Sequence, residues 1–167
     1  QRQMCIRDRT MDEQQHTISV LVANKFGALA RIAGLFSGRG YNIESLTVNR
    51  THDPELSRMT IVTTGNDAVL EQIEKQLSKL VDVESVVELD GSDYVERELV
   101  LIKVCAPSER RPEILSLVDI FGAKIPLVQK DKIVLELSGS SRKVENFISL
   151  VSDYGDIEVA RSGRTAI

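Results

Sequence analysis

The chain has 167 residues, of which 42% are hydrophobic and 28% charged, and its formal net charge is −4. This composition is ordinary for a globular protein with a core. The acidic balance argues against nucleic acid as a partner, because nucleic acid attracts clustered Lys and Arg. No apolar run approaches the ~20 residues that cross a bilayer, so no membrane span is expected. The two cysteines, Cys5 and Cys105, do not suggest a disulfide framework, and we expect a cytoplasmic protein.

The opening stretch shows neither the period of a strand nor that of a helix. We therefore assign residues 1–15 to an extraneous or disordered tail and exclude them from the fold.

Residues 16–90 predict one domain. TISVLVAN, from Thr17, alternates in the way of a strand, and a turn at 24–27 follows it. Apolar residues at helical spacing from Leu29 to Phe36 then predict an amphipathic helix. This helix ends at 38–40 with a left-handed glycine. YNIESLTVNRT and SRMTIVTT predict two strands, an N-cap within 65–67 opens a second helix with a Glu71–Lys75 pair, and VESVVEL closes the domain. The two helical stripes are Leu29, Ile32, Ala33 and Phe36, and then Leu70, Ile73, Leu77 and Leu80.

Residues 96–164 repeat this order after a short polar linker. ELVLIKVC predicts a strand, and Pro107 with a capping Ser108 opens a helix. Two short strands, a second helix and a last strand at 156–160 follow. The order β-α-β-β-α-β is the ferredoxin-like arrangement. The predicted fold class is therefore α+β, with two tandem ferredoxin-like domains.

Catalytic chemistry is not expected in this chain. Neither His16 nor His52 has a carboxylate or cysteine at the sequence spacing of a metal or catalytic site. The glycines at 34, 38 and 40 do not form a dinucleotide-binding fingerprint, and there is no phosphate-binding Walker motif. We predict neither a catalytic residue nor a metal ligand.

One region has the features of a binding site. Free N–H groups at the start of a helix attract carboxylates, and Gly27 in the first turn allows close approach to the backbone. Asn42 offers both donors and an acceptor, and Leu29 and Ile43 offer apolar walls. Together these groups could hold a free amino acid. The alternative is that Gly27 only forms a turn and Asn42 only caps the end of the helix.

The chain resembles a known family over about residues 17–163. NKFGALARIAGLFSGRGYNIESLTV, LSRMTIVT and LEQIEKQLSKLVDVESV are similar to the N-terminal ACT domain of the small regulatory subunit of acetolactate synthase (acetohydroxyacid synthase). ERELVLIKV and EVARSG resemble the second domain of that family.

The resemblance implies a cytosolic, non-catalytic homodimer that activates a catalytic subunit, a transferase, and confers feedback inhibition by valine in valine and isoleucine biosynthesis. It places the effector site between two ACT domains, with Asn24, Gly27, Ala28 and Leu29 from one protomer and Asn42 and Ile43 from its neighbour. Thiamine diphosphate, Mg²⁺ and FAD belong to the catalytic subunit and not to this chain. Lys25 and Phe26 depart from the smaller or acidic residues common in relatives, and the bulk of Phe26 could alter the size of the pocket.

Two other classes of protein fit the sequence less well. A transcriptional regulator that senses an amino acid would need a basic DNA-reading helix, which the chain lacks. An acyl-phosphate hydrolase of ferredoxin-like fold would need a catalytic constellation. The sequence leaves open which branched-chain amino acid is preferred, the stoichiometry with the catalytic subunit, its contact surface and any regulation by a nucleotide.

Overall fold

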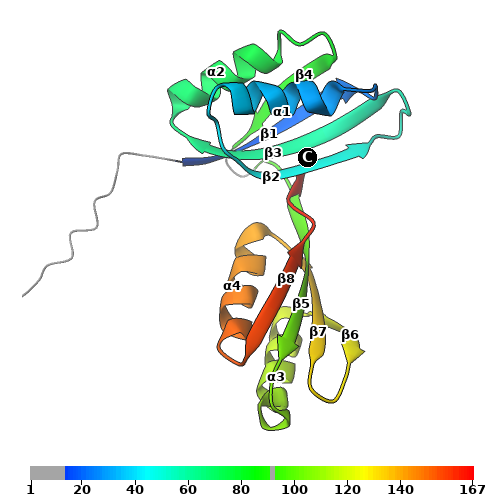
Figure 1. Ribbon diagram of the computed structural model, residues 1–167, viewed down its shortest axis with the longest axis vertical. Coiled ribbons are helices and arrows are strands. Elements are labelled where there is room, and N and C mark those ends of the chain that lie inside the picture. Colours follow the sequence, from blue (N-terminus) through cyan, green and yellow to red (C-terminus); the bar gives the residue numbers. More distant parts are fainter. Residues whose placement is uncertain (1–13, 91–92) are drawn as a thin grey trace, which may run out of the picture. The chain divides into compact units, whose positions relative to one another are not determined.

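The structure is a computed structural model that describes residues 14–90 and 93–167. It divides the chain into two compact units with their boundary between Asp93 and Tyr94. In each unit two helices cover one face of an antiparallel sheet (Figure 1). The first strand begins at Gln14, inside the segment 1–15 that was assigned to a tail, and the rest of that segment lies outside the described residues.

The first unit has the predicted β-α-β-β-α-β order. Its elements are β1 (Gln14–Ala23), α1 (Ala28–Gly38), β2 (Ile43–Arg50), β3 (Leu56–Gly65), α2 (Asp67–Leu77) and β4 (Val83–Leu89). The strands lie in the order β2-β3-β1-β4, and every neighbouring pair is antiparallel. The ferredoxin-like prediction is confirmed for this unit, and it leaves β2 and β4 as the edges of the described sheet.

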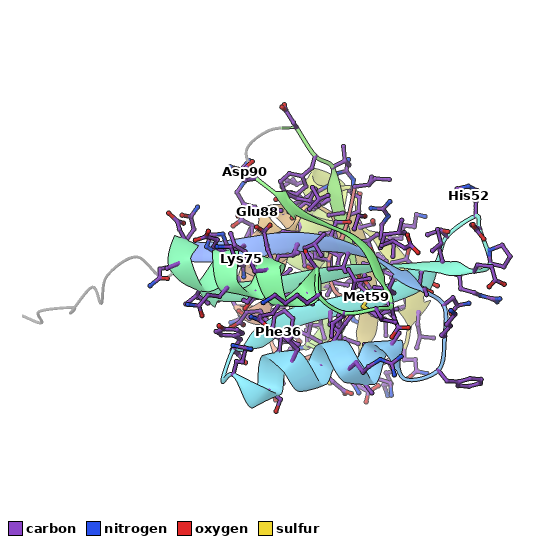
Figure 2. All side chains as sticks on the ribbon, turned by 90° about the horizontal axis from the view of Figure 1, so that it is seen from above. Phe36, His52, Met59, Lys75, Glu88 and Asp90 are labelled. Carbon is purple, nitrogen blue, oxygen red and sulfur yellow. The ribbon has the colours of Figure 1, made fainter. Side chains whose placement is uncertain are left out.

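The core of the first unit lies between its helices and its sheet, where Phe36 and Met59 are both almost fully buried (Figure 2). Ile32 and Phe36 are buried as predicted, but Leu29 is 44% exposed and Ala28 is buried instead. Ala28, Ile32 and Phe36 are spaced four residues apart and form the buried face of α1. Leu29 lies about 100° further round the helix and is left outside the core.

The predicted helix ends are partly confirmed. The Asn66 side chain caps α2 by accepting a hydrogen bond from the Val69 N–H at 3.0 Å. Lys75 donates to Glu71 at 2.5 Å, and this hydrogen bond lowers the pKa of Glu71. The left-handed glycine at the end of α1 is Gly40, with φ 71°, whereas Gly38 is still helical.

The second unit repeats the order and adds one strand. Its elements are β5 (Glu96–Cys105), a 3₁₀ turn η1 (Ser108–Arg110), α3 (Arg111–Phe121), β6 (Lys124–Val128), β7 (Ile133–Gly139), α4 (Ser141–Ser152), β8 (Asp156–Arg161) and β9 (Thr165–Ala166). The sheet order is β6-β7-β5-β8, and β9 pairs with the start of β5. The predicted limit of 96–164 omits β9.

The start of α3 differs from the prediction. Ser108 does not cap an α-helix, because it begins the 3₁₀ turn, and α3 starts only at Arg111. Pro112 lies in the first turn of α3, where its missing N–H costs no helical hydrogen bond. The proline in the first turn of α3 is therefore Pro112 and not the predicted Pro107, which precedes the 3₁₀ turn.

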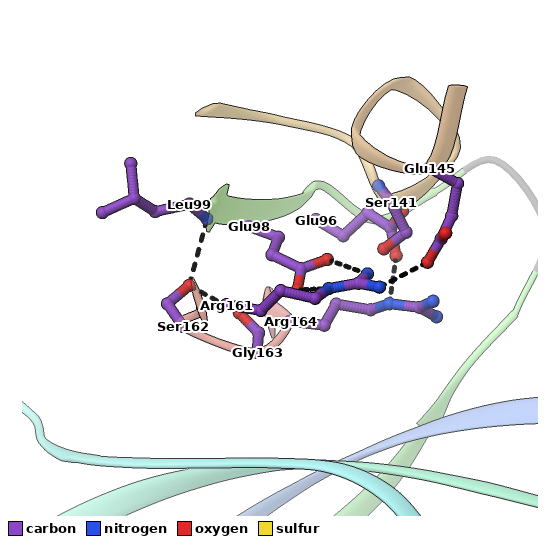
Figure 3. A network of polar contacts seen from close by, with 9 residues as sticks. All are labelled: Glu96, Glu98, Leu99, Ser141, Glu145, Arg161, Ser162, Gly163 and Arg164. Atoms are coloured by element: carbon purple, nitrogen blue, oxygen red, sulfur yellow. Dashed lines mark hydrogen bonds and ion pairs between the residues drawn. The ribbon is translucent and has the colours of Figure 1, made fainter. Parts of the chain in front are cut away.

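A polar network joins β5, α4 and β8 in the second unit (Figure 3). The Glu98 side chain is only 4% exposed, and the Arg161 guanidinium donates to both its oxygens, at 2.6 and 2.8 Å. A third bond joins Arg161 to Glu145 at 2.5 Å. These bonds, with the one to Glu98 foremost, raise the pKa of Arg161 above its usual value. The bidentate pair compensates a carboxylate that the sheet otherwise buries.

Gly155, between α4 and β8, provides a test of this packing. A Cβ on Gly155 would clash with the backbone carbonyl of Cys105, which cannot move without breaking β5. We expect Gly155→Ala to lower the free energy of unfolding by about 2–3 kcal/mol, measured by urea denaturation. Gly34→Ala in α1 is the control, because its Cβ would meet no atom of the described residues within 4 Å. This control should gain about 0.5–1 kcal/mol, and equal effects of the two substitutions would contradict the prediction.

Candidate functional site

The turn before α1 is exposed and uncapped. Gly27 is the N-cap residue in the left-handed region, with φ 82°, and none of the described side chains caps this helix. The helices α2 and α4, in contrast, are capped by the side chains of Asn66 and Ser140. The first turn of α1 also lacks an acidic residue. The positive end of the α1 dipole is therefore not compensated by a cap or an acid of its own turn.

Asn24 joins this turn to the β2–β3 loop. Its Nδ2 donates to the Pro54 carbonyl at 2.9 Å, and its Oδ1 accepts from the Ser57 hydroxyl at 3.3 Å. Gly27 and Leu29 are exposed beside it, and Ala28 is buried beneath them. Asn24 thus braces the loop, while the Leu29 side chain that the core does not use is free to contact a ligand.

Asn42 and Ile43 lie at the start of β2. The Asn42 carbonyl accepts from the Thr63 hydroxyl at 2.7 Å, which fixes the backbone of the strand start. The Asn42 side chain is exposed, and its Nδ2 donates to Glu44 at 2.6 Å. Ile43 is half-buried against the core. The side chain of Asn42 does not cap α1 through any hydrogen bond among the described residues, since its amide nitrogen is directed to Glu44.

Within one chain these two groups of residues are far apart. Ala23, beside Asn24, pairs with Leu56, whereas Ile43 pairs with Thr63. Leu56 and Thr63 are seven residues apart along β3, or about 23 Å at 3.3 Å per residue. A single copy therefore cannot bring Asn42 to the Gly27 turn, and a site that uses both needs two copies.

An ion pair that the sequence analysis missed lies beside the Gly27 turn. Arg31 in the first turn of α1 donates from both Nε, at 2.7 Å, and Nη2 to one carboxylate oxygen of Asp82. Asp82 precedes β4 and is 9% exposed, and its carbonyl accepts from the Ala23 N–H at 2.7 Å. Arg31 could have been noticed because it lies four residues after Gly27, but Asp82 is too distant in sequence for spacing to indicate it.

The two histidines have different environments. His16 is buried in β1, and its ring nitrogens lie 2.8 Å from Glu88 Oε1 and 3.2 Å from the Gly65 carbonyl. His52 is exposed at the tip of the β2–β3 loop (Figure 2). Among residues 14–90 and 93–167, no group of three or more His, Cys, Asp or Glu side chains could hold a metal ion. No helix within these ranges is long and apolar enough for a membrane span.

Comparison with known proteins identifies the family. Residues 18–85 match the family described as "AHAS small subunit-like ACT domain", and residues 97–167 match "Small subunit of acetolactate synthase". The chain belongs to the acetolactate synthase small-subunit family. Its first unit is an ACT domain, and this small-subunit chain is similar to relatives along nearly its whole length.

Three small subunits illustrate the similarity. The probable acetolactate synthase small subunit of Archaeoglobus fulgidus is 53% identical over 92% of this chain and 96% of its own length. The isozyme 3 small subunit of Escherichia coli K12 is 52% identical over 87% and 90% of the two chains. A crystal structure of the Thermotoga maritima small subunit superimposes with a TM-score of 0.82 at 43% identity, covering 92% of this chain and 96% of that one.

Proposed function

We propose that this chain is the regulatory subunit that activates the catalytic subunit of acetolactate synthase and makes its activity sensitive to valine. The observation that carries the proposal is the similarity to small subunits across both units. On this proposal the chain itself performs no catalytic step. The catalytic subunit holds thiamine diphosphate, Mg²⁺ and FAD and condenses pyruvate in the cytoplasm, for the synthesis of valine and isoleucine.

A homodimer in which β2 pairs with its own copy would complete the effector site. β2 is an edge of the described sheet, and Leu46 and Val48 on its helix side remain partly exposed. In an antiparallel pair about a two-fold axis, the start of one β2 lies opposite the end of the other. Asn42 would then approach the partner copy's β2–β3 loop, which Asn24 braces through Pro54.

The pocket formed in this way has the groups that a free amino acid needs. The N–H groups at the start of α1 would donate hydrogen bonds to the carboxylate, and the absence of a Cβ on Gly27 leaves room for its approach. The Asn42 side-chain oxygen from the second copy would accept hydrogen bonds from the ammonium. Leu29 and Ile43 would contact the branched side chain. Ala28 and Asn24 would hold the turn in place.

Valine can inhibit only through a difference in its affinity for two states of the assembly. A ligand that bridges two copies favours the state in which their edges are drawn together. Typical coupling free energies of about 1–3 kcal/mol correspond to changes of about 5- to 150-fold. We assign this two-state behaviour to the paired ACT domains. We assign the contact with the catalytic subunit to the full chain and not to one of its units.

A mixing assay tests the proposal. The purified chain is added to the catalytic subunit from the same source, and pyruvate condensation is measured with and without valine. We expect the chain to raise the activity and valine to lower it again, with leucine and isoleucine as comparison ligands. Bovine serum albumin replaces the chain as the protein control. A folded chain that neither stimulates its partner nor makes it sensitive to any of the three amino acids contradicts the proposed function.

A further inference from the structure

The guanidinium of Arg31 is held by Asp82 and still has one nitrogen that can donate to a ligand. Nε and Nη2 both donate to Asp82, whereas Nη1 has no acceptor among the described residues. The Asp82 side chain is only 10% exposed, and the Arg31 side chain is 53% exposed. A buried carboxylate therefore orients the arginine from one side and leaves the other side open to solvent.

Nη1 lies directly over the Gly27 turn. A Cβ on Gly27 would lie 3.4 Å from Nη1, so the nitrogen is within van der Waals reach of the bare glycine. This placement follows from helix geometry, because a side chain in the first turn leans back toward the helix N-terminus. A cation near the start of a helix is unfavourable with respect to the dipole. The Arg31 cation becomes favourable here when an anion binds between its guanidinium and the start of α1.

We infer that Arg31 is the residue that recognises the carboxylate of the amino-acid effector, with Asp82 as the residue that positions it. The inference rests on the proposed function, because it concerns the same site at the Gly27 turn. Arg31 Nη1 supplies a charge-assisted hydrogen bond that a backbone N–H alone cannot match. Because Asp82 fixes the guanidinium in advance, the ligand orders little of the side chain when it binds.

The assignment has a consequence for specificity. An effector must carry a free carboxylate, and an amide of the same amino acid loses the charged contact while its ammonium and side chain are kept. Valine and valinamide therefore form a matched pair of ligands. At about pH 6.5 both carry a protonated amino group, so the comparison isolates the carboxylate.

Calorimetry on the full-length protein tests this inference. The ratio of the valinamide Kd to the valine Kd is measured for the wild type and for Arg31→Gln. We expect the wild type to prefer valine strongly and Arg31→Gln to reduce that ratio about tenfold or more. Arg142→Gln is the matched control, because Arg142 is also an exposed arginine in the first turn of a helix, α4, and its ratio should equal that of the wild type.

A second variant guards against misfolding, because Arg31→Gln leaves the carboxylate of Asp82 without a cation. The double variant Arg31→Gln/Asp82→Asn replaces the ion pair with two amides and should lose the preference for valine to the same extent. An unchanged ratio in either folded variant overturns the role of Arg31 and leaves the proposed function standing. No binding of valine, leucine or isoleucine to the wild type overturns the proposed function, and this assignment with it.

Discussion

Asn42→Ala is expected to abolish inhibition by valine while activation of the catalytic subunit is retained. Asn42 is exposed, and its side chain has one bond among the described residues, to Glu44. The start of β2 is fixed instead through the Asn42 carbonyl and Thr63, so the truncation leaves the strand in place. We expect no half-inhibition at valine concentrations up to at least about ten times the value for the wild type, a factor of the order of a typical allosteric coupling.

The matched control for this prediction is Asn146→Ala. Asn146 is an exposed asparagine on α4 in the second unit, distant in sequence from every residue of the candidate site. Both variants are assayed with the catalytic subunit over a series of valine concentrations. The complex with Asn146→Ala should be inhibited by valine to the same extent as the complex with the wild type. Unchanged inhibition in Asn42→Ala would remove Asn42 from the effector site.

Arg161→Ala is expected to cause the largest loss of stability, about 3 kcal/mol. The substitution removes the guanidinium that donates to both oxygens of Glu98, whose side chain is 4% exposed in the wild type. Breaking one partner of a buried ion pair typically costs about 3–5 kcal/mol. We take the lower end because the Arg161 side chain is 37% exposed and solvent screens part of the interaction. Urea denaturation at neutral pH, followed by circular dichroism, measures the loss.

Lys103→Ala is the control for an ion pair at the surface. Lys103 pairs with Glu158, whose side chain is 73% exposed, so solvent screens the pair and its loss should lower the free energy of unfolding much less than Arg161→Ala does. The double variant Arg161→Leu/Glu98→Leu removes the buried carboxylate together with its cation and should recover much of the stability that Arg161→Ala loses. A loss of less than about 1 kcal/mol in Arg161→Ala would show that solvent already compensates Glu98.

Periodicity was sufficient to predict most of the fold. The buried residues of α2 and α4 repeat every three to four positions, and β5 and β7 alternate between buried and more exposed positions. Such patterns in the sequence allowed both βαββαβ orders to be derived before the structure. Two features were not predictable in this way. β9 has only two residues and no pattern of its own. The packing of α1 against the sheet decides which edge of its apolar stripe is covered, so the stripe alone did not show that Leu29 lies outside the core.

The candidate site was predictable in part. A glycine turn before a helix indicated the Gly27 segment, the chemistry of its amide indicated Asn42, and the resemblance to the small-subunit family placed these two groups on different protomers. The Arg31–Asp82 pair could not be predicted, because the two residues are 51 positions apart and meet only when β4 returns beside β1. The partnership of His16 with Glu88 spans 72 positions for the same reason. Long-range polar contacts of this kind follow from sheet topology and leave no local sequence signal.

The pairing of β9 with the start of β5 has a practical meaning for protein engineering. Val95 and Ile167 exchange backbone hydrogen bonds at 2.9 and 3.0 Å, so residues 94–167 begin and end at the same point. Segments whose two ends meet can be spliced into a loop of a host protein with little distortion on either side. The adjacent ends of residues 94–167 therefore make this compact unit suited to transplantation or to rejoining in a permuted order.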